Sequence, residues 1–290
     1  MLMILRQLRH GRLERLSPVW TRLGRIYRKC VSLFPRLTVS QRIGQFGPFR
    51  MSAVFAFSDL ESWGSGHNNG FQLCVEFARS CSVFFDVGAH VGYVTLPASS
   101  VMGKNSKVVS FEPSKANMAM LRLHVAKNSP DKVTIENVLV GADHAREMEF
   151  YESLGHHGQN SQKPVDVDKL RIEHGAFAKT TRKMVSLDGY CKETGLFPDL
   201  VKIDVEGAEI EVLTGAQVLL KNERPLIFLS VHPKQIESFG QTLGDLSSLI
   251  ASVEYELMTM DGEPTSTLAL EEYLMVPAER CLEIRKKLLK

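Results

Sequence analysis

The chain has 290 residues, of which 44% are hydrophobic and 23% charged, a balance typical of a folded globular protein. This composition excludes collagen-like, low-complexity and disordered chains. The longest apolar stretches, such as Leu226 to Val231, are far shorter than the roughly 20 residues that span a bilayer, so no transmembrane helix is expected.

Charge is distributed unevenly along the chain. The net charge is +2, but residues 1–50 hold eleven Arg or Lys residues against one acid, Glu14, and therefore carry +10. The other 240 residues hold 24 basic and 32 acidic side chains and carry −8. A basic arm thus precedes an acidic body, and its partner could be an anionic membrane surface, a nucleic acid or the body itself.

The arm contains apolar residues interleaved with arginines spaced by three, which predicts an amphipathic helix with a basic face within residues 1–34. Pro35 and the Gly-Pro pair at 47–48 indicate a junction, and we place the boundary between arm (1–50) and body (51–290) near residue 50. The first residues lack the apolar core of a secretory signal, and five scattered cysteines form no disulfide or zinc pattern. We therefore expect a cytoplasmic protein, with residues 1–34 as the candidate for peripheral association with an anionic membrane.

From Ser82 onward, short apolar runs alternate with longer amphipathic segments, the pattern of βαβ units. The predicted fold is α/β with a doubly wound, mostly parallel sheet. The expected strands are Val83–Asp86, Lys107–Glu112, Val133–Val138, Leu200–Asp204, Leu226–Val231, Val253–Met258 and Glu272–Val276. The expected helices are Gly92–Met102, Lys115–Asn128, Ala208–Asn222 and Lys234–Ala251.

Two irregular segments interrupt this pattern. Residues 63–70 are rich in turn formers and predict a loop that could cover a site. An insert at about 141–195 separates the third and fourth strands, and inserts at this edge of a doubly wound sheet commonly bind the substrate. The polar or aromatic residues in it are Tyr151, His156, His157, Gln159 and Asn160.

The first strand leads into an acid and a glycine turn, Asp86-Val-Gly88-Ala89-His-Val-Gly92. This turn lacks the Gly-x-Gly-x-x-Gly spacing of NAD and FAD sites, and Asp86 would repel a diphosphate. S-adenosylmethionine suits the turn better, because it has no phosphate and its amino group and sulfonium are cationic.

Two further residues extend the predicted cofactor site. Glu112 ends the second strand 24 residues after Gly88, close to the spacing at which an acid meets the ribose hydroxyls of a nucleoside. Asn137, near the end of the third strand, is expected beside the adenine. The competing interpretation is structural, with Asp86 capping the next helix and Glu112 a solvated strand end.

The fourth strand ends in acids, in Val201-Lys-Ile-Asp204-Val-Glu206-Gly-Ala-Glu209. Acids at a helix N-terminus can simply complement the helix dipole. Because Asp204 and Glu206 also stand at the carboxyl end of a central strand, a role near the transferred methyl group is expected. They could also hold a divalent metal, although two acids are a weak signal for one.

These motifs resemble the FkbM-type methyltransferases, over roughly Val83 to His232. The resemblance rests on the Asp86 turn, on Phe111-Glu112-Pro-Ser with Asn117, and above all on the Asp204 run. It implies a class I (Rossmann-like) methyltransferase domain over 51–290 that binds S-adenosylmethionine. The predicted cofactor site comprises Asp86, Gly88, Ala89, Gly92, Glu112 and Asn137.

Methylation of a hydroxyl needs a base that accepts the hydroxyl proton. His232, after the fifth strand, is the first candidate, Asp204 and Glu206 compete with it, and His156 and His157 are weaker. A histidine before a proline is otherwise an ordinary turn residue. The leading hypothesis is O-methylation of a sugar, another hydroxylated small molecule or a glycolipid. The alternatives are an RNA or protein methyltransferase, although nucleic acid is a less favoured partner, and a non-catalytic scaffold with this fold.

Overall fold

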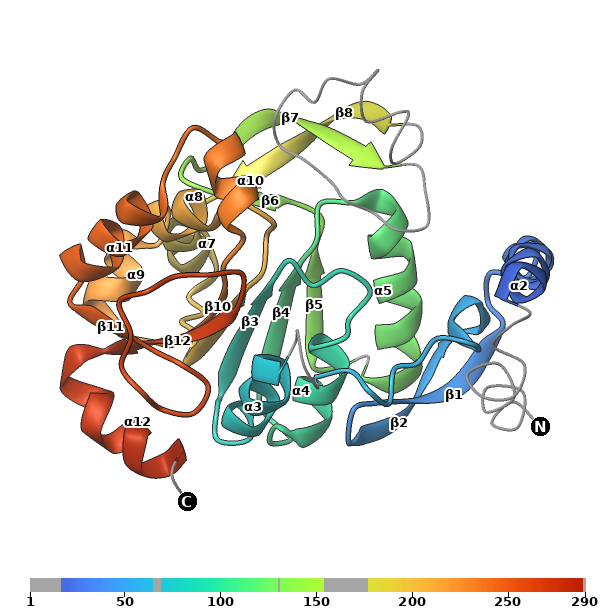
Figure 1. The fold of residues 1–290 in the computed structure, drawn as a ribbon, viewed down its shortest axis with the longest axis horizontal. Coiled ribbons are helices and arrows are strands. Elements are labelled where there is room, and N and C mark those ends of the chain that lie inside the picture. Colours follow the sequence, from blue (N-terminus) through green and yellow to red (C-terminus); the bar gives the residue numbers. More distant parts are fainter. Residues whose placement is uncertain (1–16, 65–68, 130, 154–176, 289–290) are drawn as a thin grey trace.

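A seven-stranded sheet forms the centre of the computed structural model, which describes residues 17–64, 69–129, 131–153 and 177–288 (Figure 1). The strand order is β11-β12-β10-β9-β3-β4-β5, and β12 alone runs against the other strands. The strands are β3 (Val83–Val87), β4 (Lys107–Phe111), β5 (Val133–Glu136), β9 (Leu200–Ile203), β10 (Leu226–Ser230), β11 (Tyr255–Met258) and β12 (Glu272–Pro277). All seven predicted strands and the doubly wound α/β fold are confirmed.

Helices cover both faces of the sheet because the central strands are apolar on both sides. One face packs against α3 (Asn69–Ala78), α4 (Thr95–Val101), α5 (Lys115–Asn128) and α12 (Cys281–Leu288). The other packs against α7 (Leu187–Thr194), α8 (Glu209–Thr214), α9 (Gln217–Asn222), α10 (Pro233–Ser238) and α11 (Leu243–Ser252). The sheet is thus buried between two helical layers.

Two helices predicted as continuous are each divided in two. The segment 208–222 breaks at Gly215, where a Cβ would lie 2.0 Å from the Gly141 carbonyl oxygen. The Asp188 carboxylate then caps the start of α9, because it accepts hydrogen bonds from the Val218 and Leu219 amides. The segment 234–251 breaks before Thr242, which begins α11 with a capping box. These breaks are set by tertiary contacts and local capping rather than by hydrophobic periodicity.

The boundary predicted near residue 50 is wrong, because it falls within a hairpin of β1 (Thr38–Ile43) and β2 (Phe46–Ser52). Ile43, Phe49 and Met51 are buried in the same core as Leu121 of α5. The packed body therefore includes the hairpin, which follows α2 (Ser17–Ser32). The predicted arm helix is present over 17–32, and residues 1–16 lie outside the described part of the chain. No described helix is long and apolar enough to cross a membrane.

The insert forms a second, three-stranded sheet of order β6-β8-β7. Its strands are β6 (Leu139–Val140), β7 (Arg146–Ser153) and β8 (Phe177–Val185), and Figure 1 shows β7 and β8 beyond one end of the central sheet. Tyr151 is buried in β7. His156, His157, Gln159 and Asn160 lie outside the described residues.

A buried histidine fastens the hairpin to the body. His124 of α5 is fully buried, its Nε2 accepts from the Ser52 amide at 2.9 Å, and its Nδ1 lies 2.7 Å from the Val91 carbonyl oxygen. An amide on one side and a carbonyl on the other require the neutral ring with its proton on Nδ1. Burial lowers the pKa of His124 from 6.5, although the hydrogen bond to Val91 opposes the shift.

We expect His124→Phe to lower the free energy of unfolding by about 2 to 4 kcal/mol, because it leaves a buried donor and a buried acceptor unpaired. A lowered folded pKa stabilises the protein above pH 6.5 and progressively less below it, because the unfolded chain then binds the extra proton. Urea unfolding of both proteins at about pH 7.5 and about pH 5.5 should therefore give a smaller difference at the lower pH. An equal difference at both values would contradict the neutral ring.

Candidate active site

A cavity of about 320 Å³ opens at the carboxyl ends of β3, β4, β9 and β10. The insert and α3 complete its walls. It brings together six of the nine predicted site residues: Gly88, Ala89, Glu112, Asp204, Glu206 and His232. The other three, Asp86, Gly92 and Asn137, are not among the residues that line it.

The turn after β3 fits closely against the end of β9. Gly88 has φ +80°, and a Cβ there would lie 1.9 Å from the Asp204 carbonyl oxygen, so no other residue fits. The Gly88 and Ala89 amides both donate to the Phe111 carbonyl oxygen, at 3.0 Å each. Gly92, with φ +96°, closes the turn by donating from its amide to the Ala89 carbonyl. Glycine is therefore required for the close packing of this turn against the segment after β9.

A buried ion cluster lies behind this turn. Asp86 is fully buried, and one of its carboxylate oxygens accepts from the Thr95 hydroxyl at 2.6 Å while the other lies 3.3 Å from Lys202 Nζ. Lys202 donates to the Gly88 carbonyl at 2.8 Å and lies 3.5 Å from the Asp204 carboxylate. Asp86 does not line the cavity and its partners are protein groups, so its direct contact with the cofactor stays a prediction.

Lys202 is the residue that sequence reasoning missed. Burial by itself would lower its pKa, but the charges of Asp86 and Asp204 outweigh burial and raise it above 10.5, so the ammonium stays charged. A lysine inside an otherwise apolar, central strand was the available signal, because an unpaired charge is costly in a sheet core.

Glu112 lies at the end of β4 and is buried, with 4% of its surface exposed. Its carboxylate accepts from the His90 amide at 2.8 Å, the Ser114 amide at 2.9 Å and the Asn117 side chain at 3.3 Å. Burial raises its pKa to about 7, although these hydrogen bonds act in the opposite direction. A carboxylate offers about four acceptor positions, so capacity remains for a ligand hydroxyl.

Asn137 supports this site from behind. Its side-chain amide donates to the Glu112 carbonyl at 2.7 Å and the Pro113 carbonyl at 3.0 Å. The neighbouring Val138, rather than Asn137, lines the cavity. Asn137 therefore holds the turn that carries Glu112, and its position beside the adenine stays a prediction.

The insert is tied to the same turn by a buried ion pair. Arg182 of β8 lies 2.8 Å from Glu152 of β7 and donates through Nε to the Pro113 carbonyl at 2.6 Å. Glu152 also accepts from the Ser114 hydroxyl at 2.7 Å and the Ala116 amide at 3.1 Å, at the start of α5. The insert and the Glu112 turn are thus held as one unit.

His232 stands between two carboxylates at the cavity wall. Its Nδ1 lies 2.7 Å from Oε1 of the fully buried Glu209, and its Nε2 lies 3.6 Å from Asp204. The same Glu209 oxygen accepts from the Gly207 amide, so it acts as an acceptor. The proton shared with His232 is therefore assigned to Nδ1, which leaves Nε2 as the acceptor in the neutral ring. Burial alone would lower the pKa of His232, but the hydrogen bond to Glu209 and the nearby carboxylates raise it above 6.5.

Other acids surround this histidine. Glu206 lines the cavity with a left-handed backbone, φ 51°. Glu272 of β12 is buried, and burial together with the charge of Asp204 raises its pKa to about 7. Lys202 is the only Lys or Arg among the described residues that line the cavity, so the local charge is predominantly negative. Within the described residues, no three His, Cys, Asp or Glu side chains are grouped as a metal site would require.

An aromatic wall faces these charged groups. Trp63 and Phe71 both line the cavity, with ring centroids 5.6 Å apart and planes tilted by 30°. The Trp63 carbonyl accepts from the Gln72 side chain at 3.0 Å, and the Leu60 carbonyl accepts from the Gly44 amide of the hairpin turn at 2.8 Å. The predicted covering loop therefore contributes Trp63, while residues 65–68 are outside the described chain.

The expected cofactor, S-adenosylmethionine, fits this cavity chemically. The turn at Gly88 and Ala89 lines the cavity, and buried Glu112 offers acceptor capacity for ribose hydroxyls. The sole lining ammonium, Lys202, already contacts Gly88 and two carboxylates, so a diphosphate would meet unfavourable charge. A ligand that carries an amino group and a sulfonium instead meets favourable charge.

The chain was compared with protein families and with solved structures. The family model of the Methyltransferase FkbM domain matches residues 86–257. The FkbM methyltransferase from Methylobacillus flagellatus aligns at 18% identity and a TM-score of 0.43, over 67% of this chain and 43% of that one. A putative O-methyltransferase from Klebsiella pneumoniae aligns at 10% identity and a TM-score of 0.43, over 71% and 78% of the two chains. An SAH-bound methyltransferase from Podospora anserina aligns at 10% identity and a TM-score of 0.42, over 73% and 79%.

No curated protein matches the chain. The family match nevertheless spans more than half of it and includes the turn after β3, the end of β4 and the acids after β9. The chain therefore belongs to the FkbM family of methyltransferases, with a class I Rossmann-like fold and S-adenosylmethionine as its cofactor.

Proposed function

We propose that the protein is an O-methyltransferase that acts on a sugar or another neutral, polyhydroxylated small molecule, free or attached to a lipid. The observation that carries the proposal is His232, held between the buried Glu209 and Asp204 with its Nε2 at the cavity. The bound cofactor supplies a methyl group on a positively charged sulfur, which a nucleophilic oxygen can accept.

In the proposed mechanism His232 is the general base. Glu209 accepts from Nδ1–H and fixes the ring, so the Nε2 lone pair is available to take the acceptor's hydroxyl proton as the oxygen is methylated. The Asp204 carboxylate, 3.6 Å from Nε2, then stabilises the imidazolium. A pKa somewhat above 6.5 suits a base that works near neutral pH.

Gly88, Ala89 and Glu112 are the proposed cofactor contacts. The backbone of the turn would bind the amino-acid portion, and the Glu112 carboxylate would accept from the ribose hydroxyls. Asp86, Gly92, Asn137 and Lys202 act indirectly, by holding the turn and Glu112 in place.

The cavity wall supports a neutral acceptor. Trp63 and Phe71 offer an aromatic surface of the kind that packs against the C–H face of a sugar ring. Asp204 and Glu206 line the cavity and would repel the phosphates of a nucleic acid, which argues against the RNA alternative. A scaffold without activity has no need for a histidine oriented by a buried carboxylate.

We expect His232→Ala to lower kcat by about 10² to 10⁴-fold while the affinity for S-adenosylhomocysteine stays unchanged, because only proton transfer is lost.

Wild-type kcat should rise with pH through the pKa of His232. Glu209→Gln should move that rise to lower pH, since the substitution removes a negative charge that raises the pKa of His232. His144→Ala is the matched control, because His144 lies outside the cavity against Glu193. An unchanged kcat in His232→Ala would rule the base out.

The acceptor class has a separate test. With radiolabelled cofactor, we expect transfer to hydroxylated sugars and none to analogues in which the methylated hydroxyl is replaced by hydrogen.

Trp63→Ala should raise the KM for the acceptor by about tenfold with little change in cofactor affinity, because it removes one of the two rings of the aromatic wall. Efficient transfer to RNA or to a protein substrate would contradict the proposal.

A further inference from the structure

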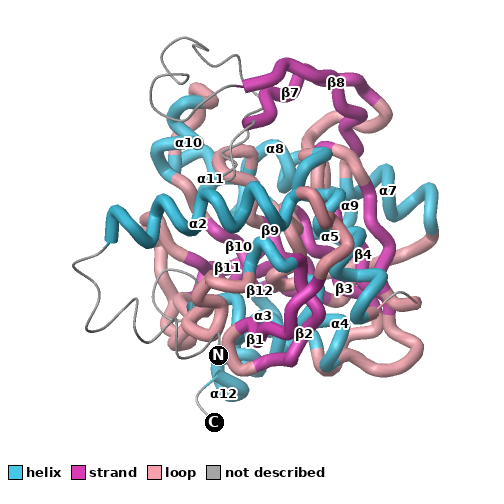
Figure 2. The backbone as a smooth tube through the Cα atoms, turned by 90° about the vertical axis from the view of Figure 1, so that its right-hand side faces the viewer, coloured by secondary structure: helices cyan, strands magenta, loops and turns pink. Residues whose placement is uncertain are grey.

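Among the side chains of α2 that the structure describes, those that contact the body lie on one side of the helix. The Tyr27 hydroxyl donates to the Ala53 carbonyl at 2.8 Å, its ring packs edge-on against Phe57 at 4.9 Å, and Val31, one turn later, is buried. Figure 2, in which the right-hand side of Figure 1 faces the viewer, shows α2 in front of the body. One long side of the helix is therefore open to solvent.

Apolar side chains are exposed along one flank of this helix and in the segment that follows it. Leu23 and Ile26 lie one turn apart and are 50% and 54% exposed, and Leu33, Phe34 and Leu37 follow at 76%, 64% and 51%. These five residues, two on α2 and three in the segment directly after it, are together named the α2 outer face. They account for five of the nine large apolar side chains that are exposed in the described chain. A concentration of this kind on one edge marks an interaction surface.

Cations flank this face. Arg22, Lys29 and Arg36 are exposed, and none has a carboxylate within ion-pair distance among the described residues. At about 100° per residue, Arg22 and Lys29 lie on the helix beside the Leu23–Ile26 stripe and away from Tyr27. Residues 1–50 carry +10 in all.

We propose that the α2 outer face binds the surface of an anionic membrane. Its leucines, Ile26 and Phe34 would enter the boundary between headgroups and acyl chains while the adjacent cations contact anionic headgroups. A second copy of the chain fits less well, because a symmetric contact would bring two +10 segments together. A nucleic acid would satisfy the cations but leave the apolar side chains in water.

This surface is independent of the proposed methylation reaction, because none of its residues lines the cavity. The test uses full-length protein and compares sedimentation with vesicles of phosphatidylcholine alone and of phosphatidylcholine with phosphatidylglycerol. We expect binding to the anionic vesicles only, weakened by added salt. Leu33→Glu/Phe34→Glu should reduce binding by about tenfold or more, and Arg22→Glu/Lys29→Glu should also reduce it.

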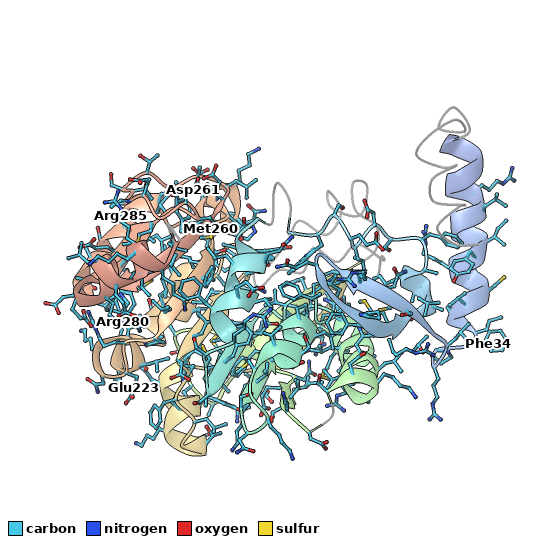
Figure 3. The ribbon with its side chains drawn as sticks, turned by 90° about the horizontal axis from the view of Figure 1, so that it is seen from below. Phe34, Glu223, Met260, Asp261, Arg280 and Arg285 are labelled. Atoms are coloured by element: carbon cyan, nitrogen blue, oxygen red, sulfur yellow. The ribbon has the colours of Figure 1, made fainter. Side chains whose placement is uncertain are left out.

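Leu282→Glu is the matched control, because Leu282 is as exposed as Leu33, at 76%, but lies on α12. Figure 3 shows α12, marked by Arg285, at the opposite side of the molecule from Phe34. Equal vesicle binding by the wild type and Leu33→Glu/Phe34→Glu would overturn the proposal. The proposal would also be overturned if the wild type were a dimer that binds no vesicles and the variant were a monomer. That result would assign the α2 outer face to self-association.

Discussion

The Lys202 ammonium, buried in the centre of the parallel sheet, connects the parts of the active site that come from different strands. It contacts Asp86 of β3, the carbonyl of Gly88 and Asp204 beyond β9. Without the cation, two carboxylates would face each other in a region of low dielectric, which is strongly unfavourable. The ion cluster therefore fixes the turn at Gly88 and, through Asp204, the acid beside His232.

Segments outside the seven-stranded sheet build the rest of the cavity. The FkbM match begins at residue 86, yet Trp63 and Phe71 come from before it, and the hairpin at Gly44 holds the loop that carries Trp63. The insert adds Phe150, and its Arg182–Glu152 pair clamps the turn of Glu112. The ends of the central strands thus supply the proposed cofactor contacts, whereas the loop at Trp63, α3 and the insert supply the remaining walls of the cavity.

The sequence predicted the central strands well because strands buried on both faces appear as short apolar runs. It also placed Glu112, Asp204, Glu206 and His232 at one edge, since carboxyl ends of parallel strands meet there. What it could not supply was the direction of each side chain. Asp86 and Asn137 point to protein partners rather than into the cavity.

Other errors also have tertiary causes. Gly47 and Pro48 indicated a linker, but a proline is tolerated in an edge strand, and the hairpin around it packs on α5. Glu209 appeared to be one more acid at a helix start until the structure placed it against His232. Each case depends on a contact between residues that are distant along the chain.

The most direct test of this account is calorimetric titration of Lys202→Met with S-adenosylhomocysteine, with Lys202→Met/Asp86→Asn as the control for charge. We predict that the single variant loses affinity by about tenfold or more, because the Gly88 turn loses its cation. We also predict that the double variant unfolds at a higher urea concentration than the single one, because it no longer holds two carboxylates without the cation. Wild-type affinity and unchanged urea unfolding in Lys202→Met would contradict the central role of this cation.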